Sequence, residues 1–288
     1  MPAAVASQVQ QWWSTVRVHT EACRLRPQPE TVHQLRTNLR RIRALTDELR
    51  DELPQPALGQ VRAILRDITR RTGRLRDLDV LIAAEDAWIA TLPPGLEPGG
   101  REVWQHLRQE QQWYRELLEG YLAGDLYRGQ CRVLDRLLPE LFTDPDGRLD
   151  EPLAARVRRT WQRVAADADR LDRDSPPQQW HRLRRRIKRL RYGLEVQPDC
   201  GARRRLLAAL RRLQQRLGTF NDSAVQLAML VPLARDEWSP AALQALGAWR
   251  ALLVQWQRAE ARRLPSALAR FACADNARLL ARVLARER

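Results

Sequence analysis

The sequence contains a single lysine, Lys188, and its few cysteines lie far apart without a CxxC pair. Zinc modules need closely spaced cysteines, so we expect no metal site and the reduced thiols of a cytoplasmic protein. No stretch approaches the roughly 18 consecutive apolar residues of a membrane span, and the first residues lack the segments of a signal peptide. β-Branched residues are sparse and no stretch alternates polar with apolar residues, which argues against a sheet. The four cysteines are Cys23, Cys131, Cys200 and Cys273.

Positive charge, by contrast, is in large excess. The 288-residue chain has 50 basic and 35 acidic residues, which gives a formal net charge of +15 and an isoelectric point near 11.1. Its apolar content of 44% is that of an ordinary globular protein, so the chain is expected to bury a core. Such an excess of basic residues favours a polyanionic partner: nucleic acid, polyphosphate or an anionic membrane.

Helix-forming residues dominate the chain. Leu, Ala, Arg, Gln and Glu recur with helical periodicity, and Pro- or Gly-containing breaks divide the chain into segments of helix length. We therefore expect an all-α fold with the ten tryptophans in its core. The polar stretch TDPDGRLDEP at 143–152 is the best candidate for a boundary between two halves.

Two sequence motifs occur twice and in the same order. VHQLRTNLRRIR, which begins at Val32, corresponds to WHRLRRRIKRLR, which begins at Trp180, and their histidines lie 148 residues apart. GRLRDLDV, which begins at Gly73, corresponds to GTFNDSAV, which begins at Gly218, at a spacing of 145 residues. Two motifs at nearly the same spacing indicate an internal duplication of a multi-helix unit.

The first motif places cations of one sign on a single helix face. At about 100° per residue, His33, Arg36, Arg40 and Arg43 share a face beside an apolar arc. The second copy places His181, Arg184, Lys188 and Arg191 in the same way. Like charges at this spacing destabilise a helix unless an anion neutralises them, and guanidinium groups bind phosphate oxygens in pairs.

Further basic residues extend these faces, since Arg66 and Arg71 correspond to Arg211 and Arg216 at the 145-residue spacing. If the repeats pack about a pseudo-two-fold axis, their motif faces meet across one basic groove, which suits an extended polyanion. For the acidic and amide residues after the motif glycines, we expect helix capping and a structural role. The candidate ligands are His33, Arg36, Arg40, Arg41, Arg43, Arg66, Arg71, His181, Arg184, Lys188, Arg189, Arg191, Arg211 and Arg216, and the capping candidates are Asp77, Asp79, Asn221 and Asp222.

The four motif segments resemble the CHAD domain, the conserved histidine α-helical domain. The likeness covers nearly the whole chain as a single domain, 1–288, with repeats at about 1–145 and 150–288. It implies two bundle-like halves around a basic central groove, in which the motif His, Arg and Lys residues bind inorganic polyphosphate without a cofactor. It also implies an association with polyphosphate granules. The second half departs from the first at Asn221, Ser223 and Ala224, where the first has Arg76, Leu78 and Asp79.

Three other functions remain open from the sequence. The charge fits a nucleic-acid binder, although no RNP1 signature, zinc-finger spacing or basic-region heptad is present. A metal-dependent phosphohydrolase would have to use His33, His181, Asp77 and Asp222, but there is no HExxH motif and arginines would repel a divalent cation. A structural protein of a granule surface is compatible with polyphosphate binding. We expect a non-enzymatic protein in which most other arginines, such as Arg286 and Arg288, are ordinary surface charge.

Overall fold

The computed structural model describes residues 4–143, 148–230 and 238–285, and these residues form helices without a single strand. The prediction of an all-α fold is therefore confirmed. Two of the residues predicted to be surface charge, Arg286 and Arg288, and the centre of the predicted boundary at 143–152 lie outside the described residues. The helices are α1 (Ala4–Leu25), α2 (Pro29–Glu48), α3 (Gln55–Arg71), α4 (Gly73–Ile82), α5 (Glu85–Ile89), α6 (Glu97–Ala123), α7 (Asp125–Leu141), α8 (Asp150–Arg170), α9 (Pro177–Glu195), α10 (Gly201–Leu230), α11 (Pro240–Phe271) and α12 (Ala274–Leu284).

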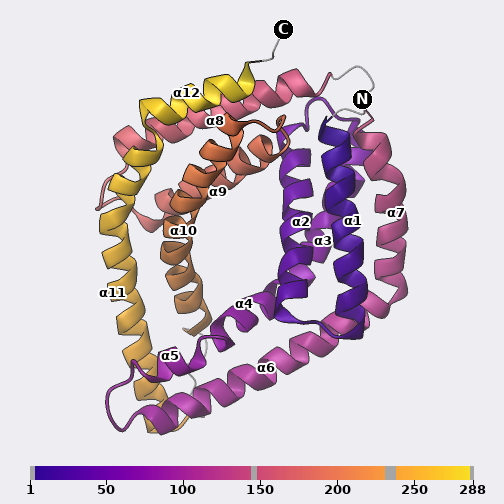
Figure 1. Cartoon of the computed structure of the whole chain (residues 1–288). Helices are drawn as coiled ribbons and strands as arrows, with labels where there is room; N and C mark the ends of the chain where they lie inside the picture. Colours follow the sequence, from indigo (N-terminus) through magenta and orange to yellow (C-terminus); the bar gives the residue numbers. More distant parts are fainter. Residues whose placement is uncertain (1–3, 144–147, 231–237, 286–288) are drawn as a thin grey trace.

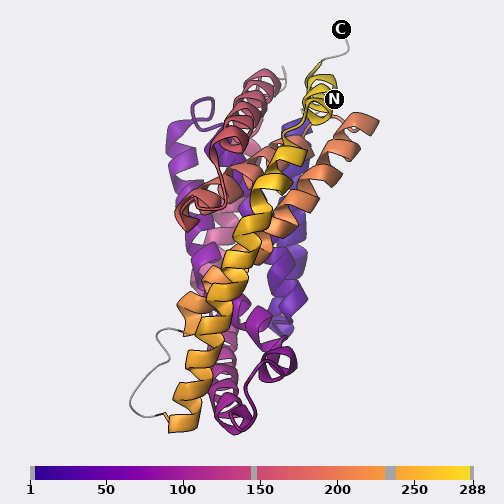
Figure 2. The ribbon, with the colours of Figure 1, turned by 90° about the vertical axis from the view of Figure 1, so that its left-hand side faces the viewer.

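The helices are arranged as a closed frame (Figure 1). α1, α2, α3 and α7 form one side, α9, α10 and α11 form the opposite side, α4, α5 and α6 close one end, and α8 and α12 close the other. Figure 2 shows the frame from its edge, with α11 towards the viewer. Within the described residues, none of the helices combines the length and the apolarity needed to cross a membrane. Both motif helices, α2 and α9, face the middle of the frame and contact each other.

The helix order follows the spacing of the repeated motifs. α2 and α9 begin at Pro29 and Pro177, which lie 148 residues apart, and proline is well suited to the first turn of a helix. The stretch that forms α3 and α4 in the first half corresponds to the single helix α10 in the second. The break at Thr72 separates α3 from α4, whereas α10 continues through the corresponding Leu217, although both residues are buried. The superposition of the two halves stays a prediction.

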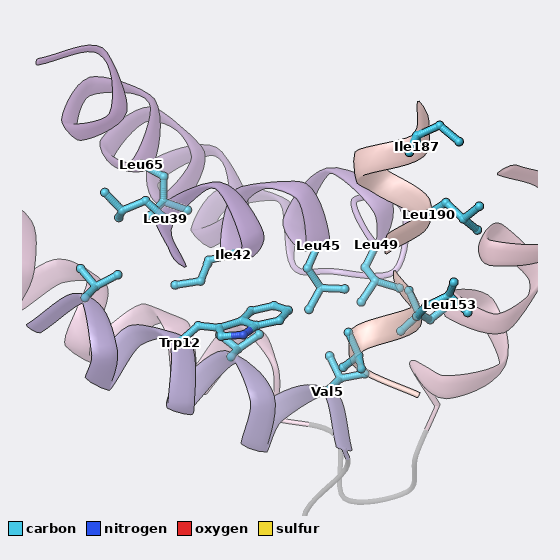
Figure 3. Close-up of a cluster of buried hydrophobic side chains, with 14 of the residues drawn as sticks. Val5, Trp12, Leu39, Ile42, Leu45, Leu49, Leu65, Leu153, Ile187 and Leu190 are labelled. Carbon is cyan, nitrogen blue, oxygen red and sulfur yellow. The ribbon is translucent and has the colours of Figure 1, made fainter. Parts of the chain in front are cut away.

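The core joins the two halves along one face of α2. Figure 3 shows Leu39, Ile42 and Leu45 of α2, and Leu49 directly after it, in a cluster with side chains of α1, α3, α8 and α9. These leucines and Ile42 are at most 1% exposed, as the helical wheel predicts for the apolar arc. Burial of each such side chain stabilises the fold by about 1.5–3 kcal/mol, so packing overcomes the repulsion along the neighbouring cationic face. The other labelled members are Val5, Trp12, Leu65, Leu153, Ile187 and Leu190.

Two tryptophans are exposed, whereas Trp88, Trp104 and Trp249 form part of a second buried cluster. Trp113 and Trp256 are 55% and 41% exposed, so the prediction that every tryptophan is buried was wrong for them. Trp113 lies on the long helix α6, and Trp256 lies on α11, where only an edge-to-face contact with Trp88 of α5, at 5.9 Å between ring centroids, covers part of its ring. The helical spacing of an aromatic residue indicates a face, but not whether another element covers it.

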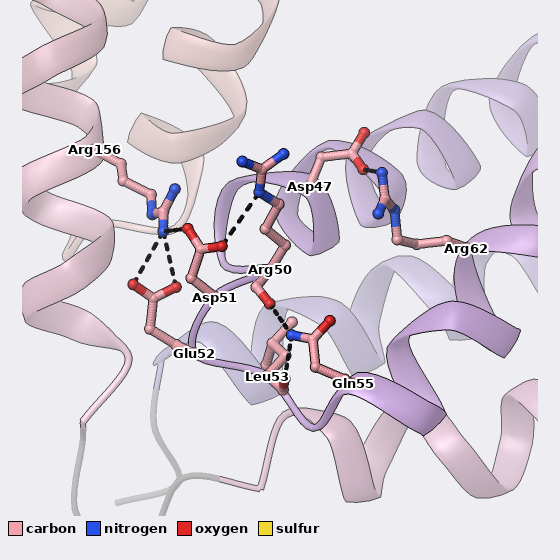
Figure 4. Close-up of polar contacts among 8 residues, drawn as sticks. All are labelled: Asp47, Arg50, Asp51, Glu52, Leu53, Gln55, Arg62 and Arg156. Atoms are coloured by element: carbon pink, nitrogen blue, oxygen red, sulfur yellow. Dashed lines mark hydrogen bonds and ion pairs between the residues drawn. The ribbon is translucent and has the colours of Figure 1, made fainter.

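Ion pairs tie α8 to the turn that follows α2 (Figure 4). The guanidinium of Arg156 on α8 lies 2.8 Å from a carboxylate oxygen of Asp51 and 3.1 Å from one of Glu52. Nearby, Arg62 of α3 lies 2.7 Å from Asp47 of α2. These contacts neutralise arginines outside the central region, so those arginines are not available to an anionic ligand.

Candidate anion-binding cavity

A cavity of about 640 Å³ lies between α2, α4, α9 and α10. Its lining carries seven cationic side chains, two carboxylates and one histidine, which leaves five net positive charges if every lysine and arginine is protonated. A concave site with one excess sign of charge concentrates counter-ions in its interior. These lining groups are Arg36, Arg40, Arg76, Arg184, Lys188, Arg191, Arg211, Asp77, Asp222 and His33.

Arg36 is held rigidly at the wall of the cavity. Its guanidinium donates hydrogen bonds to the carbonyl oxygen of Thr69, at 2.7 Å, and to Oγ1 of Thr72, at 2.8 Å. Arg36 thus provides a donor for one carbonyl group in the last turn of α3 and for the hydroxyl of the residue between α3 and α4. Burial, followed by the charge of Arg40, lowers the pKa of Arg36 to about 10, so it stays positively charged at neutral pH.

Arg40, Arg184 and Lys188 bring the charges of the two motif helices together. Burial, followed by repulsion from Arg184 and Arg40, lowers the pKa of Lys188 to about 7. Arg40 acts in the same direction on Arg184, whose pKa is lowered first by burial. Among the described residues, Arg40, Arg184, Lys188 and Arg211 form no ion pair with any carboxylate. Such uncompensated cations are unfavourable unless a bound anion neutralises them.

Asp77 and Asp222 open onto the cavity from α4 and α10. Partial burial raises the pKa of both carboxyls, while Arg36 lowers that of Asp77 and Arg184 lowers that of Asp222. Neither approaches an arginine closely enough to form an ion pair within the described residues. The two carboxylates reduce the positive charge of the cavity but do not neutralise it.

The prediction that these acidic and amide residues cap helices was wrong. Asp77 and Asp79 lie inside α4, and Asn221 and Asp222 lie in the middle of α10, because Gly218 does not end that helix. Asp79 is buried and accepts a hydrogen bond from Gln111 of α6, at 2.7 Å. Asn221 Oδ1 lies 2.9 Å from Nδ1 of His181.

Several predicted ligands lie outside the cavity, and most of them are paired with other groups. Arg41 contacts Glu195, Arg71 contacts Asp67, Arg189 contacts Glu48 and Arg216 contacts Glu260, at 2.9–3.6 Å. His181 is exposed and bonds Asn221, although its counterpart His33 lines the cavity. Arg43 and Arg66 line none of the cavities described here. The structure therefore assembles His33, Arg36, Arg40, Arg184, Lys188, Arg191 and Arg211.

The cavity also contains residues that the sequence did not single out as ligands. Arg76 of α4 lines it and donates to the carbonyl oxygen of Pro29, at 3.4 Å. Gln214, Gln215 and Gln226 line it from α10. Arg76 lies within a repeated motif and could have been included on that ground. The glutamines recur at helical spacing with Arg211 and Asp222, but a row of amides on a long helix is by itself ordinary surface.

No group of three His, Cys, Asp or Glu residues in the described part of the chain could hold a metal ion. Burial, followed by repulsion from Arg76, lowers the pKa of His33, so its imidazole is neutral at neutral pH and cannot add a charge there. The lining thus consists of guanidinium, ammonium and amide donors around a few carboxylates. Such donors bind anionic oxygens.

Comparisons with known proteins agree with this architecture. The family model of the CHAD domain matches residues 3–231. The crystal structure of the CHAD domain from the plant Ricinus communis is similar, with 23% identity, a TM-score of 0.76 and coverage of 93% of this chain and 92% of that one. PptA from Streptomyces chartreusis is similar with 18% identity, a TM-score of 0.70 and coverage of 93% and 99%. A comparison with curated proteins finds no match.

Proposed function

The chain belongs to the CHAD domain family, and from this premise we propose that it binds inorganic polyphosphate in the cavity between α2 and α9 without altering it. The observation that carries the proposal is a group of cations from three helices that face one cavity without carboxylate partners among the described residues: Arg40, Arg184, Lys188 and Arg211. Guanidinium groups bind phosphate oxygens in bidentate fashion, and the surrounding low dielectric strengthens each contact. Binding of this kind would place the protein at polyphosphate granules.

A phosphate chain suits this cavity better than a nucleic acid does. Proteins that bind single-stranded nucleic acids without sequence preference combine basic grooves with aromatic platforms on which bases stack. Among the described lining residues, Tyr192 is the only phenylalanine, tyrosine or tryptophan, and it is 6% exposed and offers no free ring face. A bare phosphate chain needs no stacking platform, because each unit presents only anionic oxygens.

The proposal is tested by calorimetric titration with long-chain polyphosphate at several salt concentrations. We expect saturable binding whose affinity falls steeply with salt, because each neutralised phosphate releases condensed counter-ions. In the same samples, release of orthophosphate is followed with and without divalent metal ions, and no turnover is expected. An affinity that does not depend on salt would contradict the proposal, and sustained phosphate release would show an enzyme.

The affinity should also depend on pH through Lys188. In the free protein its pKa is about 7, and a bound phosphate chain raises this value by stabilising the ammonium form. The complex therefore takes up a proton above pH ~7, and the affinity should fall by up to about tenfold per pH unit between pH ~7 and ~9. Lys188→Arg, whose side chain stays charged, should flatten this profile. If the substitution leaves the slope unchanged, Lys188 does not contact the ligand.

A further inference from the structure

A second cavity adjoins the central one. Its volume is about 410 Å³, and it lies between α1, α2, the end of α9 and the first turns of α10. Arg211 lines both cavities, so a single guanidinium reaches from one to the other. The second cavity also presents Arg41 and the amides of Gln8, Gln34 and Asn38. Its donors are of the same kind as those in the central cavity.

Three charged side chains that contact one another in a row lie between the two cavities. Glu195, the last residue of α9, accepts from Nε of Arg191 at 2.7 Å, and its other oxygen lies 3.0 Å from Nε of Arg41. Arg191 lines the central cavity, whereas Arg41 and Glu195 line the second one. The three side chains are 15–23% exposed, so solvent reaches them. Glu195 thus bridges one arginine from each motif helix.

This bridge leaves donors unused. Nε of Arg41 and Oε2 of Glu195 are close, but their geometry is not that of a hydrogen bond, and both are buried without a hydrogen-bond partner in the described residues. Nε2 of Gln214, which lines the central cavity, lacks a hydrogen-bond partner in the same way. Arg191 donates its other bond to Oε1 of Gln214, at 2.9 Å, and this contact keeps Arg191 in place without Glu195. An acceptor with several anionic oxygens would satisfy the two free donors, Nε of Arg41 and Nε2 of Gln214, better than one carboxylate does.

We infer that the second cavity is a further binding site for the phosphate chain, and that Glu195 occupies Arg41 until the chain displaces it. A chain held by Arg40, Arg184 and Lys188 would continue past Arg211 and exchange the carboxylate contact of Arg41 for phosphate oxygens. Short chains end within the central cavity and leave the Glu195 bridge intact. This inference rests on the proposed function and adds to it a preference for long chains.

The test compares Glu195→Gln with the wild type, using tripolyphosphate and polyphosphate of many units as probes. Removal of the competing carboxylate should tighten long-chain binding by about tenfold, which is the effect of one charge-assisted contact, and tripolyphosphate binding by less. Glu21→Gln makes the same charge change on α1, where Glu21 pairs with Arg24 and lines neither cavity, and should leave both affinities unchanged. An equal gain at both chain lengths would overturn the second site.

A second variant should change the affinity for long chains in the opposite direction. Arg41→Gln should weaken long-chain binding several-fold and leave tripolyphosphate binding as in the wild type, because Arg41 lines only the second cavity. Thermal unfolding checks that the loss of the Arg41 contact with the Trp12 ring does not unfold the protein. Long-chain affinity that is unchanged in this variant would overturn the inference while the proposed function stands. If the wild type binds neither probe, the proposed function fails first.

Discussion

Replacement of both Arg184 and Lys188 by glutamate is expected to lower the affinity for polyphosphate by about a hundredfold or more. Each side chain lines the central cavity, and neither has a carboxylate partner among the described residues. A charge-assisted contact contributes about 1.5–3 kcal/mol, so two lost contacts alone produce this effect, before any repulsion of the phosphates by the new carboxylates. Calorimetric titration at fixed salt measures the change.

The matched control is Arg132→Glu together with Arg136→Glu. These residues have the same spacing of four positions on α7, are exposed and line none of the cavities described above. Both double variants lower the net charge from +15 to +11, because each replaces two positive charges by two negative ones. If only the general field of the protein attracted the ligand, the two variants would lose similar affinity. The cavity account predicts a loss of only a few-fold for the α7 variant.

Circular dichroism shows whether both variants fold. The Arg184 and Lys188 variant removes repulsion among buried cations, so its unfolding temperature should not fall, and this keeps a loss of affinity interpretable. Comparable losses of affinity in two folded variants would contradict a specific cavity and would mean that the ligand is attracted only by the net positive charge of the protein.

Long-chain polyphosphate should compete at least about a hundredfold better than orthophosphate at equal total phosphate, because linked groups bind one after another within a single molecule. The cations that would hold the chain come from both motif helices, with Arg40 on α2 and with Arg184 and Lys188 on α9. A single orthophosphate ion can contact only some of these cations at a time.

Displacement of a fluorescently labelled polyphosphate measures the competition. A series of chain lengths should show affinity that rises with length until the cavities are filled and then levels off. Orthophosphate that competes as well as the chain at matched phosphate concentration would mean that the protein binds isolated anions at independent sites.

Helical periodicity predicted the fold and one face of the site from the sequence. Leu39 and Ile42 had to face the core, and this fixed the direction of Arg36 and Arg40 on the neighbouring face. The duplication then indicated that Arg184 and Lys188 occupy the equivalent positions. Both pairs line the central cavity.

Contacts between helices determine which motif arginines are free to bind a ligand, and the sequence does not show these contacts. Arg41 and Arg189 lie in the same motifs as the cavity residues, but Glu195 and Glu48 meet them from the ends of α9 and α2. A helical wheel contains no information on which carboxylate a neighbouring helix brings. The capping prediction for Asp222 was wrong for a related reason, since α10, which packs against α9, α11 and α12, continues through Gly218.

The central claim is that the phosphate chain lies inside the frame, between the two motif helices. A crystal structure of the protein with bound long-chain polyphosphate tests it most directly. We predict consecutive phosphates in the central cavity, within hydrogen-bond distance of Arg40, Arg184 and Lys188. Phosphates bound only along the outer surface, for example at Arg132 and Arg136 of α7, with solvent in the central cavity, would contradict the account.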